Sequence, residues 1–158
     1  MRRKDREIAD FDEQYAILSR LDTIRVAMFD GEYPYVVPVS FGCEKRDGRA
    51  VLYFHSAKAG HKVDALAADP HVCIEGDVTF KVEPTDHGIT TRYESVIGRG
   101  LCELVEDEAE KIRGLRLLCG HYGFMNYDLA GCRGLPMVNV YRITVERLTA
   151  KRNAPLDA

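Results

Sequence analysis

The sequence predicts a mainly β protein, a small closed barrel of six or seven mostly antiparallel strands with about three helices at its periphery. Short apolar or alternating runs recur along the chain and are separated by hairpin turn signals, which favours antiparallel pairing over a parallel sheet. Gly98 and Gly100 interrupt a long run of this kind, and glycines inside a strand are typical of the tight corners of barrels.

Length and composition limit the possible classes of protein. The chain of 158 residues suits one domain, with an N-terminal arm at 1–10 and a C-terminal tail at 150–158. A net charge of −3 argues against a broad surface for nucleic acid or anionic membrane. The chain has no apolar run of membrane-spanning length, and its start has no apolar secretory segment. We therefore expect a cytoplasmic protein.

The five cysteines also bear on this class. They are odd in number, widely spaced and without a CxxC pair. Small buried thiols in a reducing compartment explain them better than disulfides or zinc ligands, so we expect no metal site.

The first part of the chain predicts one helix followed by three strands. Tyr15, Leu18 and Leu21 recur at helical spacing, and the next segment alternates between apolar and polar residues. Pro38 cannot donate to a neighbouring strand, so its own strand lies at an edge or is bulged. The predicted elements are a helix over 12–21 and strands over 23–29, 35–41 and 50–55, with turns at 30–31 and 45–48.

The second part predicts two further helices and three or four strands. A kink at Gly76-Asp77 would separate a strand from its continuation. Asp107 and Glu110 offer a capping box for the longest helix. The predicted elements are helices over 61–69 and 107–122, strands over 71–76, 92–105 and 137–148 with a possible continuation over 78–82, and loops at 84–88 and 124–134.

The stretch over 52–70 carries the clearest functional signal. A short aromatic strand leads through the polar loop 55–60 into a helix whose first residues are His61 and Lys62. Free backbone N–H groups and the helix dipole favour an anion at such a helix start. Lysine is unfavourable there unless an anion lies beside it, although a solvated first-turn lysine is the simpler alternative. We therefore expect a phosphorylated ligand over residues 55–62.

Four motifs in order resemble the pyridoxamine 5′-phosphate oxidase-like flavoproteins, in particular their 5-nitroimidazole-resistance (Nim-type) branch. The opening MRRKDREI is also similar to that branch. The resemblance covers nearly the whole chain, and the order and spacing of the motifs make it specific. The motifs are EYPYVVPVSFG (32–42), LYFHSAKAGHKVDALAADPHVCIEGD (52–77), TTRYESVIGRG (90–100) and VNVYRITVERLTAK (138–151).

This resemblance implies an FMN-binding split β-barrel that forms a homodimer with the cofactor at its interface. The matching stretches also imply which residues contact the cofactor. These are the backbone of Val37, Pro38, Val39 and Ser40 along the isoalloxazine edge, His55 and Ser56 beside the ring and the ribityl chain, His61 and Lys62 at the phosphate, and Ser95 from the other subunit.

Two departures separate the chain from the true oxidases. His61 stands where the oxidases have arginine, and histidine is fully charged only part of the time near neutral pH. The chain also has no tryptophan, whereas the oxidases use arginine and tryptophan near the C-terminus to hold pyridoxine phosphate. We therefore do not expect pyridoxamine phosphate oxidase activity.

The expected function is that of an FMN-dependent reductase that takes electrons from NADH or NADPH. The resemblance suggests a small, flat, electron-poor substrate of the nitroimidazole type. Tyr35, Tyr93 and Phe124 are the candidates for its aromatic wall, and His55 is the candidate acid. The alternative is a non-catalytic protein that holds a flavin or haem for storage, sensing or protection. For each polar candidate, a solvated or structural side chain is the competing interpretation.

Overall fold

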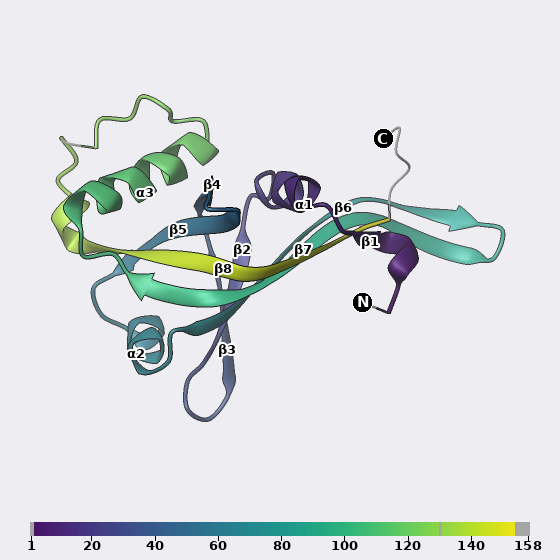
Figure 1. Ribbon diagram of the computed structural model, residues 1–158, viewed down its shortest axis with the longest axis horizontal. Helices are drawn as coiled ribbons and strands as arrows, with labels where there is room; N and C mark the ends of the chain where they lie inside the picture. Colours follow the sequence, from purple (N-terminus) through teal and green to yellow (C-terminus); the bar gives the residue numbers. More distant parts are fainter. Residues whose placement is uncertain (1, 130, 154–158) are drawn as a thin grey trace.

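The computed structural model describes residues 2–129 and 131–153 and consists of one antiparallel sheet with helices at its margins (Figure 1). The described residues form eight strands: β1 (Glu7–Ile8), β2 (Ile24–Phe29), β3 (Pro34–Val39), β4 (Gly42–Arg46), β5 (Arg49–Ala57), β6 (His71–Thr85), β7 (Gly88–Leu104) and β8 (Val138–Asn153). The helices are α1 (Phe11–Leu18), α2 (His61–Ala68) and α3 (Glu108–His121), with short 3-10 turns at Lys4–Arg6 and Leu135–Met137.

The strands follow the order β3-β2-β6-β7-β8-β5-β4, and β1 adds to β8. Every pair in the sheet is antiparallel. This confirms the predicted mainly β, antiparallel split barrel with three helices. It also confirms that Pro38 lies in an edge strand, because β3 ends the sheet. The strand count exceeds the prediction because β1 and β4 were not foreseen.

The predicted turn at 45–48 and the predicted strand over 35–41 have the wrong bounds, because a further strand, β4, lies between β3 and the turn. The chain leaves β3 at Val39 and enters β4 at Gly42, and the second turn is confined to Asp47 and Gly48, both with positive φ (51° and 73°). The sequence pattern does not indicate β4, because its charged residues form ion pairs and give it no apolar face.

Parts of the expected arm and tail belong to the sheet, since Glu7–Ile8 form β1 and residues 150–153 end β8. Glu7 and Ile8 pair with Lys151 and Ala150, and Ile8 is 8% exposed. Strand β8 therefore continues to Asn153, beyond the predicted end at 148, while residues 154–158 lie outside the described part. Local patterns missed this pairing because it joins the two ends of the chain.

Strand β6 runs through Gly76-Asp77 without the predicted kink, and its irregularity is a bulge between Thr79 and Lys81. The predicted irregularity at Gly100 is present, since the β7–β8 register shifts between Arg99 and Gly100. A Cβ at Gly100 would lie 2.0 Å from the carbonyl oxygen of Thr144, so the strands approach each other too closely for any side chain there.

Strand β5 is buried on both faces and separates two apolar clusters. Leu52 and Phe54 face the interior of the barrel, whereas Val51 and Tyr53 face α3. All four side chains are at most 2% exposed. Alternation sends successive side chains to opposite faces, so one strand contributes to both clusters. The strand that precedes the predicted anion site is therefore the most enclosed part of the sheet.

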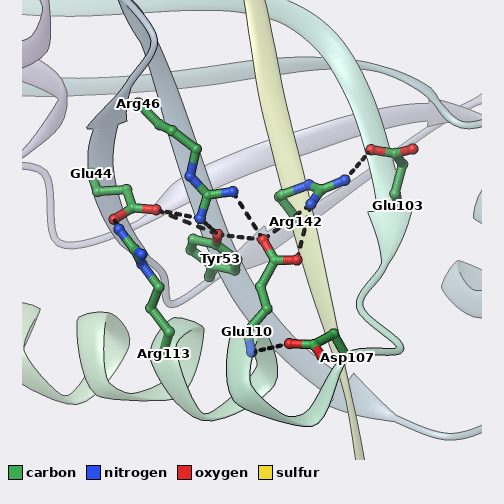
Figure 2. Close-up of polar contacts among 8 residues, drawn as sticks. All are labelled: Glu44, Arg46, Tyr53, Glu103, Asp107, Glu110, Arg113 and Arg142. Atoms are coloured by element: carbon green, nitrogen blue, oxygen red, sulfur yellow. Dashed lines mark hydrogen bonds and ion pairs between the residues drawn. The ribbon is translucent and has the colours of Figure 1, made fainter.

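A polar network fastens α3 over β5 (Figure 2). The hydroxyl of Tyr53 donates to Glu110 (2.8 Å) and accepts from Arg46 (2.6 Å). Arg142 donates to both carboxylate oxygens of Glu110 at 3.0 Å. Asp107 caps α3 by accepting the backbone N–H of Glu110 at 2.8 Å. The predicted cap is thus present, but the Glu110 side chain binds the barrel instead of completing a capping box.

We predict that Glu110→Gln destabilises the fold by about 2 kcal/mol near neutral pH, because it removes charge-assisted hydrogen bonds from a partly buried group. Burial acts to raise the pKa of Glu110, but hydrogen bonds from Tyr53, Arg142 and Arg46 outweigh it and lower that pKa. The stabilisation is therefore complete above the unfolded-state value of 4.5 and is lost as the pH falls through the lowered folded-state pKa.

Urea unfolding of the wild type and of this variant at several pH values measures the difference. It should shrink as the solution becomes more acidic than pH 4.5. A difference that does not depend on pH would contradict the assignment. Glu108→Gln, which changes an exposed glutamate two residues earlier in the same helix, is the matched control.

Candidate functional site

The N-terminus of α2 is open, as an anion site requires. Gly60 precedes the helix with φ 132°, a backbone conformation that favours glycine, and no side chain caps the first turn. The carbonyl oxygen of Gly60 accepts the N–H groups of Val63 and Asp64. The backbone at the helix start can therefore meet an anionic ligand.

Lys62 supplies a cation with no carboxylate partner at this helix start. Its Nζ lies 5.3 Å from the centre of the Phe54 ring and forms no hydrogen bond or ion pair with residues 2–129 or 131–153. Partial burial lowers the pKa of Lys62. A half-buried ammonium group held only by a ring is costly, and a bound anion would remove that cost.

His61 is held in place by two neighbours on the β2–β3 hairpin. Its Nε2 lies 3.1 Å from Oδ2 of Asp30, and its ring meets that of Tyr35 edge-on, with centroids 4.6 Å apart. Asp30 also accepts the backbone N–H groups of Tyr33 (2.7 Å) and Glu32 (3.0 Å), and these bonds together with His61 lower its pKa. The sequence predicts a turn at Asp30 but not this contact, which joins residues 31 positions apart.

His55 and Ser56 do not share one face of β5. His55 is exposed, whereas Ser56 is 9% exposed and its hydroxyl donates to the carbonyl of Ala57 at 3.0 Å. The end of the strand directs the two side chains to opposite sides. His55 is therefore accessible to a ligand, while Ser56 is occupied within the chain.

The predicted residues of β3, and Ser40 just after it, also fall into a group that faces the core and an exposed group. Val37 and Val39 face the barrel core, and Val39 is 7% exposed. Pro38 and Ser40 are exposed at the edge of the sheet. Tyr35 shares the inward side with the two valines and reaches His61. The structure thus brings β3, His61 and Lys62 to one end of the barrel.

Ser95 and Tyr93 lie away from that end. Strands β2 and β6 separate β7 from β3. Leu101 is paired with His71 just after α2, and Ser95 lies six residues before Leu101 in β7, which corresponds to about 20 Å of extended strand. Phe124 is also apart, 65% exposed in the segment after α3. One chain therefore does not assemble all the predicted contacts around one ligand.

The described residues contain neither a metal-binding group of side chains nor a membrane-spanning helix. Within residues 2–129 and 131–153, no three His, Cys, Asp or Glu side chains are grouped so that they could hold a metal ion. No helix in these ranges has both the length and the apolar character needed to cross a membrane.

The antiparallel split barrel with an uncapped, cationic helix start defines the class of protein. Comparison with known families gives its membership: the chain belongs to the pyridoxamine 5′-phosphate oxidase family, whose model matches residues 10–152. The family predicted from the four motifs is confirmed. No curated protein matches the chain in sequence.

Solved structures share the fold over almost the whole chain. A protein named for 5-nitroimidazole antibiotic resistance, from Bacteroides thetaiotaomicron, is 30% identical with a TM-score of 0.80, covering 92% of this chain and 85% of that one. The flavocytochrome Anf3 of Azotobacter vinelandii is 21% identical (TM-score 0.78; 100% and 75% covered). An FAD- and haem-binding protein of Mycobacterium smegmatis is also 21% identical (TM-score 0.73; 97% and 77% covered).

Proposed function

We propose that the chain binds FMN with the phosphate over residues 60–62 and acts as a reductase of small, planar, electron-poor compounds. The observation that carries this proposal is the unpartnered, half-buried ammonium group of Lys62 beside the uncapped start of α2. Family membership supports it, and the similar structures named for FAD binding share the fold.

The residues at this end of the barrel fit such a cofactor. Lys62 and His61 would hold the phosphate, with the exposed backbone around Pro38 and Ser40 along the ring. When bound, FMN supplies hydride and electron-pair chemistry, so the protein mainly binds and orients. His55 is exposed beside the loop and is our candidate proton donor, since imidazole is the side chain that most often acts as a general acid.

The substrate proposal rests on the similarity to the Bacteroides thetaiotaomicron protein. We propose nitroimidazole-type compounds as substrates and NADH or NADPH as the electron donor. Tyr35 is already in contact with His61 and would form one aromatic wall. Tyr93 and Phe124 lie elsewhere in the same chain, so they would contribute only through a second copy or a rearranged segment.

We predict that Lys62→Ala weakens FMN binding about tenfold or more at pH 7, because it removes a charge-assisted contact to the phosphate. Affinity in the wild type should fall as the pH rises through the lowered pKa of Lys62, since the ammonium form is the binding form. Fluorescence titration of FMN measures both effects. Lys4→Ala, an exposed lysine outside this region, is the control, and equal losses in the two variants would place the phosphate elsewhere.

We further predict that the FMN-loaded protein consumes NADH or NADPH and reduces a nitroimidazole to its amine, with loss of the nitro absorbance. His55→Ala should slow this turnover more than it weakens FMN binding, if His55 donates a proton. Flavin binding without turnover on any nitro compound would exclude the reductase and leave the binding protein described next.

A second candidate is a non-catalytic protein that holds flavin or haem. The similar flavocytochrome and the FAD- and haem-binding protein favour it, although their identity of 21% supports the fold alone. The absorption spectrum of the purified protein distinguishes the two cofactors. Flavin bands together with turnover support the reductase, whereas a Soret band supports the haem-binding alternative.

We also propose that the protein is a homodimer with the cofactor at the interface. The hairpin between β6 and β7 extends beyond the body of the molecule (Figure 1). Glu83 pairs with Lys81 and Arg92, each at 2.7 Å, on one of its faces. Val82 and Ile89 lie on the other face and are 60% and 80% exposed. An isolated two-stranded hairpin is marginally stable in water, so a covering partner would stabilise it.

A second copy of the chain accounts for this hairpin and for the position of Ser95. The outward face of β7 continues from the hairpin through Tyr93 and Ser95 to Ile97, which is 48% exposed. If this face packs on a second copy, Ser95 can approach the other subunit's flavin, which it cannot do within its own chain. A two-fold arrangement would cover both hairpins equally.

We predict that Val82→Lys combined with Ile89→Lys converts the dimer to a monomer and weakens FMN binding. Light scattering after size-exclusion chromatography gives the mass of each species. Met137→Lys, which places a charge at another exposed apolar position (70% exposed), should leave the dimer intact. A double variant that stays dimeric would show that the hairpin is not the interface.

A further inference from the structure

A hollow of about 450 Å³ lies between α1 and α3, away from the proposed flavin site. Figure 1 shows these helices on the side of the barrel opposite α2, with β4 between them. The lining includes Tyr15 from α1, Cys43 from β4, Arg116 and Leu117 from α3, and Met125 from the segment that follows. Nothing in the proposed reductase function uses this hollow.

The polar groups of the hollow leave one cation uncommitted. Arg113 is paired with Glu44, and Nε2 of His121 lies 2.8 Å from the carbonyl oxygen of Leu21. Arg116 forms no hydrogen bond or ion pair with any of residues 2–129 or 131–153, and no carboxylate is among the described lining residues. The hollow can therefore offer the free guanidinium group of the exposed Arg116 to an anionic ligand, while the nearby Glu44 carboxylate is held by Arg113.

The rest of the lining is apolar and partly aromatic. Leu117 and the Tyr15 ring provide fixed walls, while Met125 is 77% exposed at the rim. The aromatic ring of Tyr15 and the flexible thioether of Met125, which both line the hollow, are well suited to contact a flat apolar body. The volume is about three times that of an engineered cavity that takes one benzene, so it suits a body of one or two rings together with water.

We propose that this hollow is a second small-molecule site, which binds a flat aromatic carboxylate of one or two rings. The rings lie between Tyr15, Leu117 and Met125, and the carboxylate accepts hydrogen bonds from the guanidinium of Arg116. Binding involves no chemical step. The site is independent of FMN, since none of these residues belongs to the α2 end of the barrel.

The test is titration of the protein with naphthalene-2-carboxylate, monitored by calorimetry and by backbone amide NMR. The acid should bind and move the resonances of Cys43 and Leu117. Arg116→Gln should weaken binding about tenfold, the loss of one charge-assisted hydrogen-bonding group. Arg49→Gln removes the same charge at an exposed position outside the hollow and should leave binding unchanged.

Three outcomes would overturn the proposal: no binding by the wild type, equal affinity in the wild type and Arg116→Gln, or resonance changes confined to other surfaces. The uncharged naphthalene-2-carboxamide should bind the wild type as weakly as the acid binds Arg116→Gln. Circular dichroism of both variants verifies that they are folded. Because the titration does not depend on FMN, its result is separate from that of the flavin experiments.

Discussion

The side chain of Tyr53 joins the barrel, α3 and the charged surface between them. It is fully buried, and its ring packs so closely against α3 that a Cβ at Gly114 would lie 2.6 Å from it. Its hydroxyl, at the far end of the ring, lies between Glu110 and Arg46. One residue thus fills the apolar space under α3 and also donates a hydrogen bond to the Glu110 carboxylate. That hydrogen bond compensates for the water that the carboxylate loses in the fold. Tyr53 therefore adds a buried ring and two hydrogen bonds where α3 meets β4 and β5, beside the ion pairs of Glu110 with Arg46 and Arg142.

The same strand determines where the candidate site lies. Both faces of β5 are covered by other side chains. The strand therefore has a fixed position close to the loop that leads into α2. The exposed backbone at the start of α2 and the Lys62 ammonium group are therefore presented by a rigid support, as is common for binding loops. On its inward side this support is aromatic, since Phe54 lies below Lys62 and stacks on Tyr141 at 5.3 Å.

Electrostatic pairing within the chain distinguishes structural cations from those free for ligands. Arg46 and Arg142 are committed to Glu110, and Arg152 to Glu94, a carboxylate whose side chain is only 5% exposed. Such pairs fix the relative positions of strands and helices, and they contribute less to the net free energy of folding. Lys62 and Arg116 have no carboxylate partner among the described residues, and both lie where an anion can reach them. The lack of a partner, together with the uncapped helix start beside Lys62 and the hollow beside Arg116, is the basis of the two ligand sites that we propose.

Local patterns in the sequence were sufficient to predict the main helices and strands. Alternation predicted β2 and most of β8, the strand-loop-helix pattern predicted α2, and Asp107 predicted the start of α3, because each of these depends on neighbours within a few residues. The four motifs were sufficient for the family, since their order is itself a property of the sequence. The tertiary structure alone decided the pairing of Ile8 with Ala150, the strand hidden in the charged residues of β4, and the contact between Asp30 and His61. It also separated Ser95 from Lys62. These features join residues distant in the chain, and no local periodicity records such contacts.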